Sequence, residues 1–291
     1  MKTLFKKTFI FISIPLIYLS LITSFNYYQI KESKPTIPIV NYLILGDSHI
    51  QNSIDSDYFN NAVNYAKSGE PYFVSFWKLK HLISHPNVSL DTVLLGFSHH
   101  DISEKKDNSL SDAGASVQFK RNYSIHIFTK QDSVDTDYFK YFNVLLRNVA
   151  AYPKLNHHGF QGKYSRLKKK LTKREFYNEP FQNHNHFYDK NNEYGISRTN
   201  LNYLDSIVSL CNSQDIELKL VATPVSKKYY ENIPNKFLVK YEELKSIYRM
   251  NGTPVYDFSQ VIIQDSLFAD FNHLNEVGSQ LFMKRNFNRN N

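Results

Sequence analysis

The sequence predicts an α/β fold in which helices cover both faces of a mostly parallel sheet. Short apolar runs rich in β-branched residues recur along the chain, and stretches of helical length separate them. This alternation occupies an early block and a late block of the sequence. A chain of 291 residues is long enough to bury the core that such a fold requires.

The early block begins with residues 39–46 (IVNYLILG), an apolar run that ends in a glycine. Such a run is typical of a buried strand that leads into a turn. A second short strand is expected at 62–66 and a third at 91–97. Between them we expect a helix at 71–84, because proline suits the first turn of a helix.

The late block begins with a predicted helix at 199–213, whose apolar side chains fall on one face. The helix that ends the chain should begin near Asn275, a residue type that caps helix N-termini well. The remaining expected elements are a strand at 217–223, a helix at 234–250 and a short strand at 254–258.

The N-terminal residues 8–25 carry no charge and approach the roughly twenty residues that a membrane-spanning helix needs. Lys2, Lys6 and Lys7 precede them, which favours a cytoplasmic N-terminus and an extracytoplasmic remainder. The small-residue pattern of a signal-peptidase site is poor, so a retained anchor is favoured over a cleaved signal. The sequence therefore predicts a single-pass membrane protein.

We expect a membrane anchor at 1–30, a linker at 31–38 and one folded domain at 39–291. From about 103 to 195 the alternation fails, and this polar, basic and aromatic stretch is interpreted as an insertion. Within it, residues 163–175 (KYSRLKKKLTKRE) would place cations around most of a helix. A solvated helix face is favoured, with anionic lipid headgroups and acidic polysaccharide as alternative contacts.

The net charge of +8 is compatible with nucleic acid, anionic lipid or acidic polysaccharide as a partner. The sequence has no zinc-finger spacing, RNA-recognition signature or P-loop, so we expect no nucleic-acid partner. We also expect no metal and no other cofactor. His99 and His100 raise the possibility of a metal site, but adjacent residues on a strand would point to opposite faces. His184 and His186 could bind a metal weakly, but surface positions in a loop are favoured for both.

Two short motifs indicate nucleophilic chemistry. Gly46-Asp47-Ser48 follows the first predicted strand, and the carboxyl ends of parallel strands are where open α/β sheets place their ligands. Asp270-x-x-His273 lies near the C-terminus, where one tight turn could hold the carboxylate against the imidazole. A serine needs a base to take its proton and a third group to orient that base. These motifs predict Ser48 as nucleophile, His273 as base and Asp270 as the orienting group.

In this order the two motifs resemble those of the SGNH (GDSL-like) hydrolase superfamily, over about residues 39–101 and 199–288. Ser68-Gly69 is similar to the block whose glycine amide helps form the oxyanion hole in that family. The segments GDSHIQNSIDSDYF and NAVNYAKSGEPYF resemble the membrane-anchored branch, which includes proteins of alginate O-acetylation and teichoic-acid D-alanylation.

The third block departs from the Gly-x-Asn-Asp pattern of that family, because residues 96–101 (GFSHHD) contain no asparagine. We expect Ser98 or His99 to supply the missing donor, beside the amides of Ser48 and Gly69. A hole built from the two amides alone, or a weakened enzyme, remains an alternative.

The resemblance implies an extracytoplasmic serine esterase or O-acyltransferase that acts on acyl groups of an envelope or secreted glycan. Its partners would be an acylated glycan or acyl donor, the membrane itself and a membrane acyl-donor protein. The alternative is a non-catalytic glycan-binding or assembly protein of the same fold, which the altered third block and the insertion favour.

Overall fold

The computed structural model describes residues 2–32, 37–110, 164–170, 184–189, 192–261 and 264–287. The chain forms two compact units. One contains Met1–Thr36 and Leu110–Phe160, and the other contains Ile37–Ser109 and Gln161–Asn291.

The first unit contains helix α1 (Lys2–Glu32). Its stretch Thr3–Phe25 has 23 residues and a mean hydropathy of 2.0, so it is long and apolar enough to span a membrane or to act as a signal sequence. The predicted apolar helix is thus present at the N-terminus.

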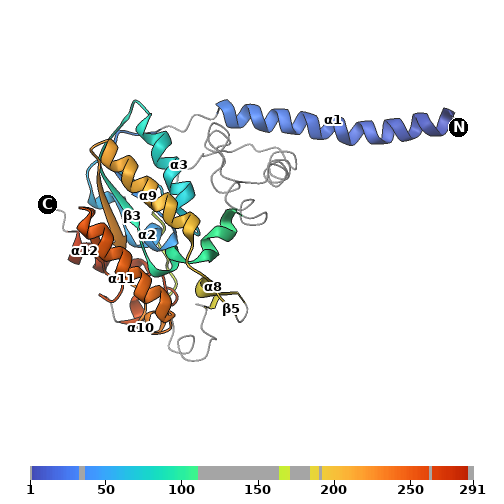
Figure 1. The fold of residues 1–291 in the computed structure, drawn as a ribbon. Helices are drawn as coiled ribbons and strands as arrows, with labels where there is room; N and C mark the ends of the chain where they lie inside the picture. The colour runs from blue at the N-terminus through green and yellow to red at the C-terminus, as the bar shows by residue number, and fades with distance from the viewer. Residues whose placement is uncertain are drawn as a thin grey trace. The chain divides into compact units, whose positions relative to one another are not determined.

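The second unit contains a sheet with helices around it (Figure 1). The sheet has five strands in the order β2-β1-β3-β6-β7, and every pairing is parallel. This is the doubly wound order whose direction reverses between the first and third strands. The predicted parallel sheet is confirmed. Its strands are β1 (Val40–Leu45), β2 (Ala62–Asn64), β3 (Val88–Gly96), β6 (Glu217–Ala222) and β7 (Val255–Asp257).

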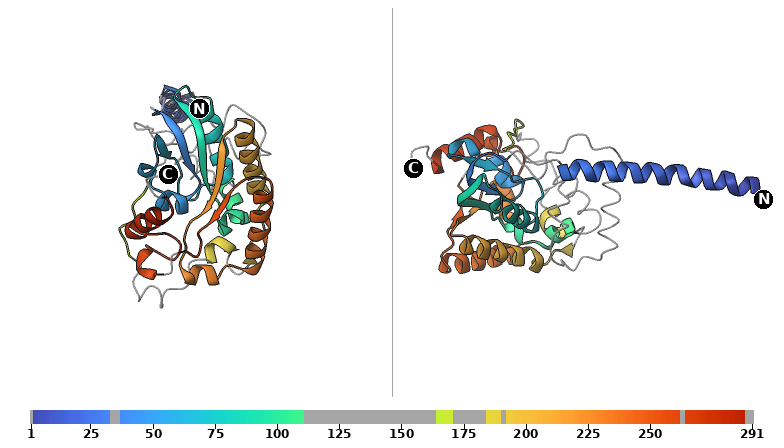
Figure 2. Two further views of the ribbon diagram at one scale, coloured as in Figure 1. Left: turned by 90° about the vertical axis from the view of Figure 1, so that its left-hand side faces the viewer. Right: turned by 90° about the horizontal axis from the view of Figure 1, so that it is seen from above.

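Helices cover both faces of this sheet, because the reversal of strand order moves the crossover connections from one face to the other. Figure 2 shows α9 and α11 on one side of the strands and α12 on the other. The longer helices of this unit are α3 (Tyr72–Ile83), α9 (Arg198–Ser213), α11 (Asn235–Met250) and α12 (Glu276–Asn286).

The shorter elements lie mostly where the sequence predicted none. Single helical turns lack the periodicity that reveals longer helices. The shorter helices and strands are α2 (Ser48–Ser53), η1 (Ser56–Tyr58), η2 (His99–Ile102), η3 (Glu104–Leu110), α8 (His184–Phe187), β4 (Tyr188–Asp189), β5 (Asn192–Glu193), α10 (Lys227–Glu231) and η4 (Asp265–Leu267).

The helix expected at 163–175 is wrong for residues 164–170, which have no regular secondary structure. Their backbone groups instead bond to neighbouring elements. Ser165 N donates to Gln51 O, and Leu167 O accepts from Glu276 N at 2.8 Å. These contacts hold the segment along the residues of α2 and the start of α12. Residues 163 and 171–175 lie outside the described residues.

The carboxyl ends of β1 and β3 approach each other closely at two glycines. Gly46 has φ +125°, and a Cβ there would lie 3.1 Å from Gly96 N and 3.0 Å from Ile50 Cγ2. A side chain at Gly46 would therefore be strained by its backbone angle and crowded by its neighbours. Glycine at position 46 therefore allows the chain to turn directly from β1 into α2.

A buried ion pair supports the turn that follows β2. Lys78 of α3 donates to the Glu70 carboxylate and to Tyr65 O, and Ser75 also donates to Glu70. The side chains of Lys78 and Glu70 are both fully buried. Since Glu70 follows Gly69 directly, the pair fixes the position of that glycine.

Replacing Lys78 by methionine should leave the Glu70 carboxylate buried without its cation. We expect Lys78→Met to lower the free energy of unfolding by about 3–5 kcal/mol. The double variant Glu70→Gln/Lys78→Met should recover part of that loss. Chemical denaturation of the detergent-solubilised chain measures both, and a loss below about 1 kcal/mol for Lys78→Met would contradict the expectation.

Candidate functional site

The candidate site lies at the carboxyl ends of the strands, beside the switch point between β1 and β3. Ser48 is the first residue of α2, and its side chain is partly exposed. The N-cap residue Asp47 accepts a hydrogen bond from His49 N at 3.0 Å. Turn and cap together hold the serine hydroxyl at the edge of the sheet.

His273 lies in a turn that its own neighbours fix. Asp270 Oδ1 accepts from the backbone N–H groups of Asn272 and His273, at 3.0 and 2.9 Å. Ala269 N donates to His273 O, and the Asn275 amide bonds to Ser266 O and Phe268 O. Asn275 therefore has two roles: its side-chain amide holds the turn, and the residue caps α12.

Ser48, His273 and Asp270 come together in one hydrogen-bonded chain. The Ser48 Oγ lies 2.8 Å from His273 Nε2, and His273 Nδ1 lies 2.9 Å from Asp270 Oδ2. Burial alone would raise the pKa of Asp270, but the hydrogen bond and charge of His273 hold it below its usual value. The carboxylate is thus ionised at neutral pH and can orient the imidazole.

The four residues expected to supply oxyanion donors lie in different surroundings. Ser48 N stands at the N-terminus of α2, where the first backbone N–H groups have no partner within the helix. Gly69 is exposed in the turn after β2, with φ +71°. Ser98 is buried, and its N–H donates to Asp101 Oδ2 at 2.8 Å.

The ring of His99 packs against aromatic side chains that follow β6. Its centroid lies 4.1 Å from that of Tyr241 and 5.5 Å from that of Tyr230. Burial lowers the pKa of His99 to about 4. These contacts engage His99 with α11, whereas the neighbouring His100 lies against α2. The geometry therefore gives no support to His99 as the substitute donor.

A buried charge network surrounds Asp47, and the sequence did not predict it. The Asp47 Oδ2 lies 2.6 Å from His100 Nε2 and 2.8 Å from Lys106 Nζ, and Lys106 also pairs with Asp101 at 2.7 Å. Burial would raise the pKa of Asp47, but Lys106 and His100 hold it well below its usual value. Asp47 therefore keeps its charge although it is only 4% exposed.

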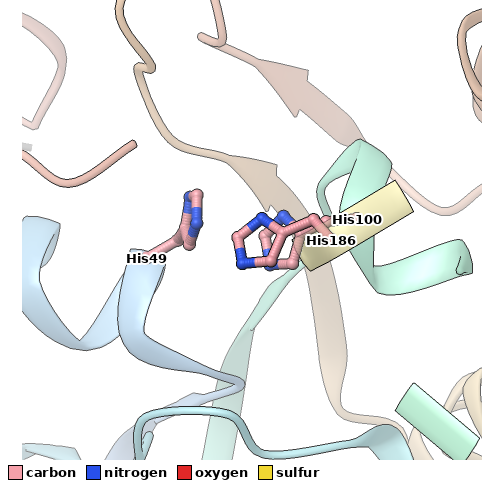
Figure 3. Close-up of side chains that lie close together, drawn as sticks. All are labelled: His49, His100 and His186. Atoms are coloured by element: carbon pink, nitrogen blue, oxygen red, sulfur yellow. The ribbon is translucent and has the colours of Figure 1, made fainter. Parts of the chain in front are cut away.

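Three histidines from separate elements meet beside this network (Figure 3). The His49 and His100 ring centroids are 4.1 Å apart, and those of His100 and His186 are 4.9 Å apart. The expectation of a surface loop for His186 is wrong, because the residue lies in α8 and its ring is partly buried against His100. The His184 side chain lies outside the described residues.

Sequence reasoning missed His49 and Lys106, and it expected no site at His100 and His186. Only long-range folding brings them together, since His49 and His186 lie 137 positions apart in the sequence. The one local signal was the histidine directly after Ser48. Its packing against the His273 ring, at a centroid distance of 4.9 Å, places the cluster next to the catalytic candidates.

Comparison with models of protein families finds no match, and comparison with curated proteins finds none. Solved structures do show similarity. A proposed acylhydrolase from Bacteroides fragilis is 13% identical, with a TM-score of 0.42, over 90% of this chain and 93% of its own. A GDSL-like lipase from Bacteroides thetaiotaomicron is 10% identical, with a TM-score of 0.40, over 91% and 98%. Such values are too low to assign a chemistry to this chain.

Replacing Asp47 by asparagine should leave the buried Lys106 and His100 with one carboxylate fewer. We expect Asp47→Asn to lower the free energy of unfolding at pH 7 by about 3–5 kcal/mol. The depressed pKa of Asp47 stabilises the fold above the unfolded-state value of about 4, and that contribution is lost as pH falls through the folded-state value. Acidification should therefore destabilise the variant less than the wild type.

Denaturation at a series of pH values between 7 and 3 measures this effect. Asp57→Asn, at an exposed residue of η1, is the matched control and should behave as the wild type. An Asp47→Asn protein with wild-type stability and wild-type pH dependence would show that the network contributes nothing.

Proposed function

We propose that this chain is a serine esterase or O-acyltransferase with Ser48 as nucleophile, His273 as general base and Asp270 as the orienting carboxylate. The single observation that carries the proposal is the continuous chain of hydrogen bonds from Ser48 Oγ through His273 to Asp270. Each contact has the length that such a relay requires. Ser48 is also partly exposed, as a residue that meets a substrate must be.

The reaction follows from these positions. His273 Nε2 takes the proton of Ser48 Oγ as the oxygen attacks the ester carbonyl carbon. The imidazolium then returns that proton to the leaving alkoxide, and the acyl group remains on Ser48. Water or a sugar hydroxyl then gives its proton to His273 and attacks the acyl-serine. The imidazolium passes this proton to the departing Ser48 Oγ, which restores the free serine and the neutral base. Asp270 stabilises the charged imidazole in both halves.

The oxyanion of each tetrahedral intermediate would bind the backbone N–H groups of Ser48 and Gly69. The close packing of Gly46 holds the first of these amides in place, and the Glu70–Lys78 pair supports the second. A donor of this kind is worth about 3–4 kcal/mol of transition-state stabilisation. The two amides need no side chain from the third block, where the expected asparagine is missing.

The proposed substrate is an acyl group on a cell-envelope or secreted glycan, with a membrane-bound acyl donor as partner in the transferase case. The support for this setting is the apolar N-terminal helix, which would tether the site outside the cytoplasm. The resemblance of residues 46–59 and 61–73 to the membrane-anchored branch points the same way.

A non-catalytic glycan-binding or assembly protein is the second candidate. The observation that favours it is the engagement of the third block in other contacts. His99 packs on Tyr241, and Ser98 N is bonded to Asp101. If the protein only binds its partner, Ser48 would keep its hydrogen bond to His273 but would not react with electrophiles.

Reaction with a fluorophosphonate probe separates the two candidates. Wild-type protein should be labelled covalently at Ser48, while Ser48→Ala and His273→Ala should lose labelling, because the first lacks the nucleophile and the second its base. His81→Gln, at an exposed residue of α3, is the control and should react normally. Absence of labelling in folded wild type would favour the binding protein.

The orienting role of Asp270 has its own test. Asp270→Asn keeps the size of the side chain but removes the negative charge that selects the productive imidazole tautomer. We expect esterase or probe-labelling rates at pH 7 to fall by about 10⁴-fold while Ser48 stays in place. Labelling kinetics measure the change, and a loss smaller than about tenfold would sink the proposed role.

A further inference from the structure

We propose that His49, His100 and His186 form a binding site for a divalent transition-metal ion of the Zn²⁺ type, separate from the Ser48–His273–Asp270 chain. The three imidazoles come from α2, η2 and α8, and Figure 3 shows the overlapping rings of His100 and His186 with the His49 ring beside them. One ring nitrogen of each lies within 4.8 Å of the corresponding nitrogens of the other two.

The strongest argument is the isolation of the His49 ring. His49 is 2% exposed, and among the described residues neither Nδ1 nor Nε2 has a hydrogen-bond partner. A buried polar atom left without a partner costs about 1–3 kcal/mol, so a native protein rarely keeps one without a purpose. A metal ion would use one of these nitrogens as a ligand.

The other two histidines already have the outer partners that metal ligands have. His100 Nε2 bonds to Asp47 Oδ2 at 2.6 Å, and His186 Nδ1 bonds to Tyr229 Oη at 2.8 Å. Each contact leaves the opposite nitrogen of its ring for a metal, namely Nδ1 of His100 and Nε2 of His186. Ligating histidines typically bond their second nitrogen to a carboxylate or another polar group, which fixes the ring.

The ring nitrogens of the three histidines lie slightly further apart than those of a metal-bound site. Zn–N bonds of about 2.0–2.1 Å in tetrahedral geometry place ligand nitrogens roughly 3.4 Å apart. For the one nitrogen of each ring that lies within 4.8 Å of its counterparts, whichever of Nδ1 and Nε2 it is, the approach needed is about 1.4 Å at most. Rotation of the His49 ring, which no described hydrogen bond restrains, would bring its nitrogen closer to the other two. The His100 and His186 rings, which stack at an interplanar angle of 23°, would also have to tilt so that their in-plane lone pairs converge on the ion.

The donor set selects the class of ion. Three imidazoles suit Zn²⁺, Cu²⁺, Ni²⁺ or Co²⁺, whereas Mg²⁺ and Ca²⁺ prefer oxygen ligands. Lys106 opposes a cation here, but it is paired with both Asp47 and Asp101. These two carboxylates offset its charge. Three protein ligands leave a fourth position for water or another molecule.

Titration of the chelator-treated full chain with Co²⁺ and Zn²⁺, in detergent and without a histidine tag, tests the site. We expect one equivalent of Zn²⁺ by calorimetry and a visible absorption band for Co²⁺ bound to imidazole nitrogens. His49→Phe and His186→Phe should each abolish this binding, and His81→Gln should leave it unchanged. Tyr229→Phe removes an outer partner and should weaken binding by about 10- to 100-fold.

Circular dichroism and fluorophosphonate labelling of His186→Phe would establish that the variant keeps its fold and its reactive serine. This readout separates the metal site from the acyl-transfer proposal, because either can fail while the other stands. Wild-type protein that binds neither ion, or equal binding in both phenylalanine variants with the fold intact, would overturn the metal site.

Discussion

The buried carboxylate of Asp47 ties together the elements that form the candidate site. It caps α2 through His49 N, bonds to the His100 ring of η2 and pairs with Lys106 of η3. Burying an ion is unfavourable unless it is paired and hydrogen-bonded, and Asp47 is both. The orientation of Ser48 therefore depends on a charge network formed by residues from two separate loops.

The proposed general base is supported independently of this network. His273 takes its position from the turn at Asp270 and from α12, whose Gly278 lies so close to Leu267 O that a Cβ there would be 2.1 Å from it. Ser48 and His273 are thus held by two separate sets of contacts. Helix α12 joins these sets, because its Ser279 Oγ donates to Ser53 O at the end of α2. The 2.8 Å contact between Ser48 and His273 depends on both sets of contacts being rigid.

The sheet and the Ser48–His273 pairing could be predicted because their signals are local: apolar runs, a strand-ending glycine and two short motifs. The histidine cluster could not. His99 and His100 follow the end of β3 and lie in the 3-10 helix η2, so the alternation of a strand does not apply to them. Residues 164–170 are irregular because their backbone bonds to Gln51 and Glu276, contacts that helical periodicity cannot reveal.

Adjacent residues of α2 connect the two proposed chemistries. Successive side chains on a helix diverge by roughly 100°, so Ser48 can meet His273 while His49 turns toward His100 and His186. The His49 and His273 rings still lie only 4.9 Å apart between centroids. A dication bound to His49 would disfavour the imidazolium that His273 must become during acyl transfer. Metal binding at the cluster would consequently slow the reaction of Ser48, and α2 would couple the two sites through neighbouring residues.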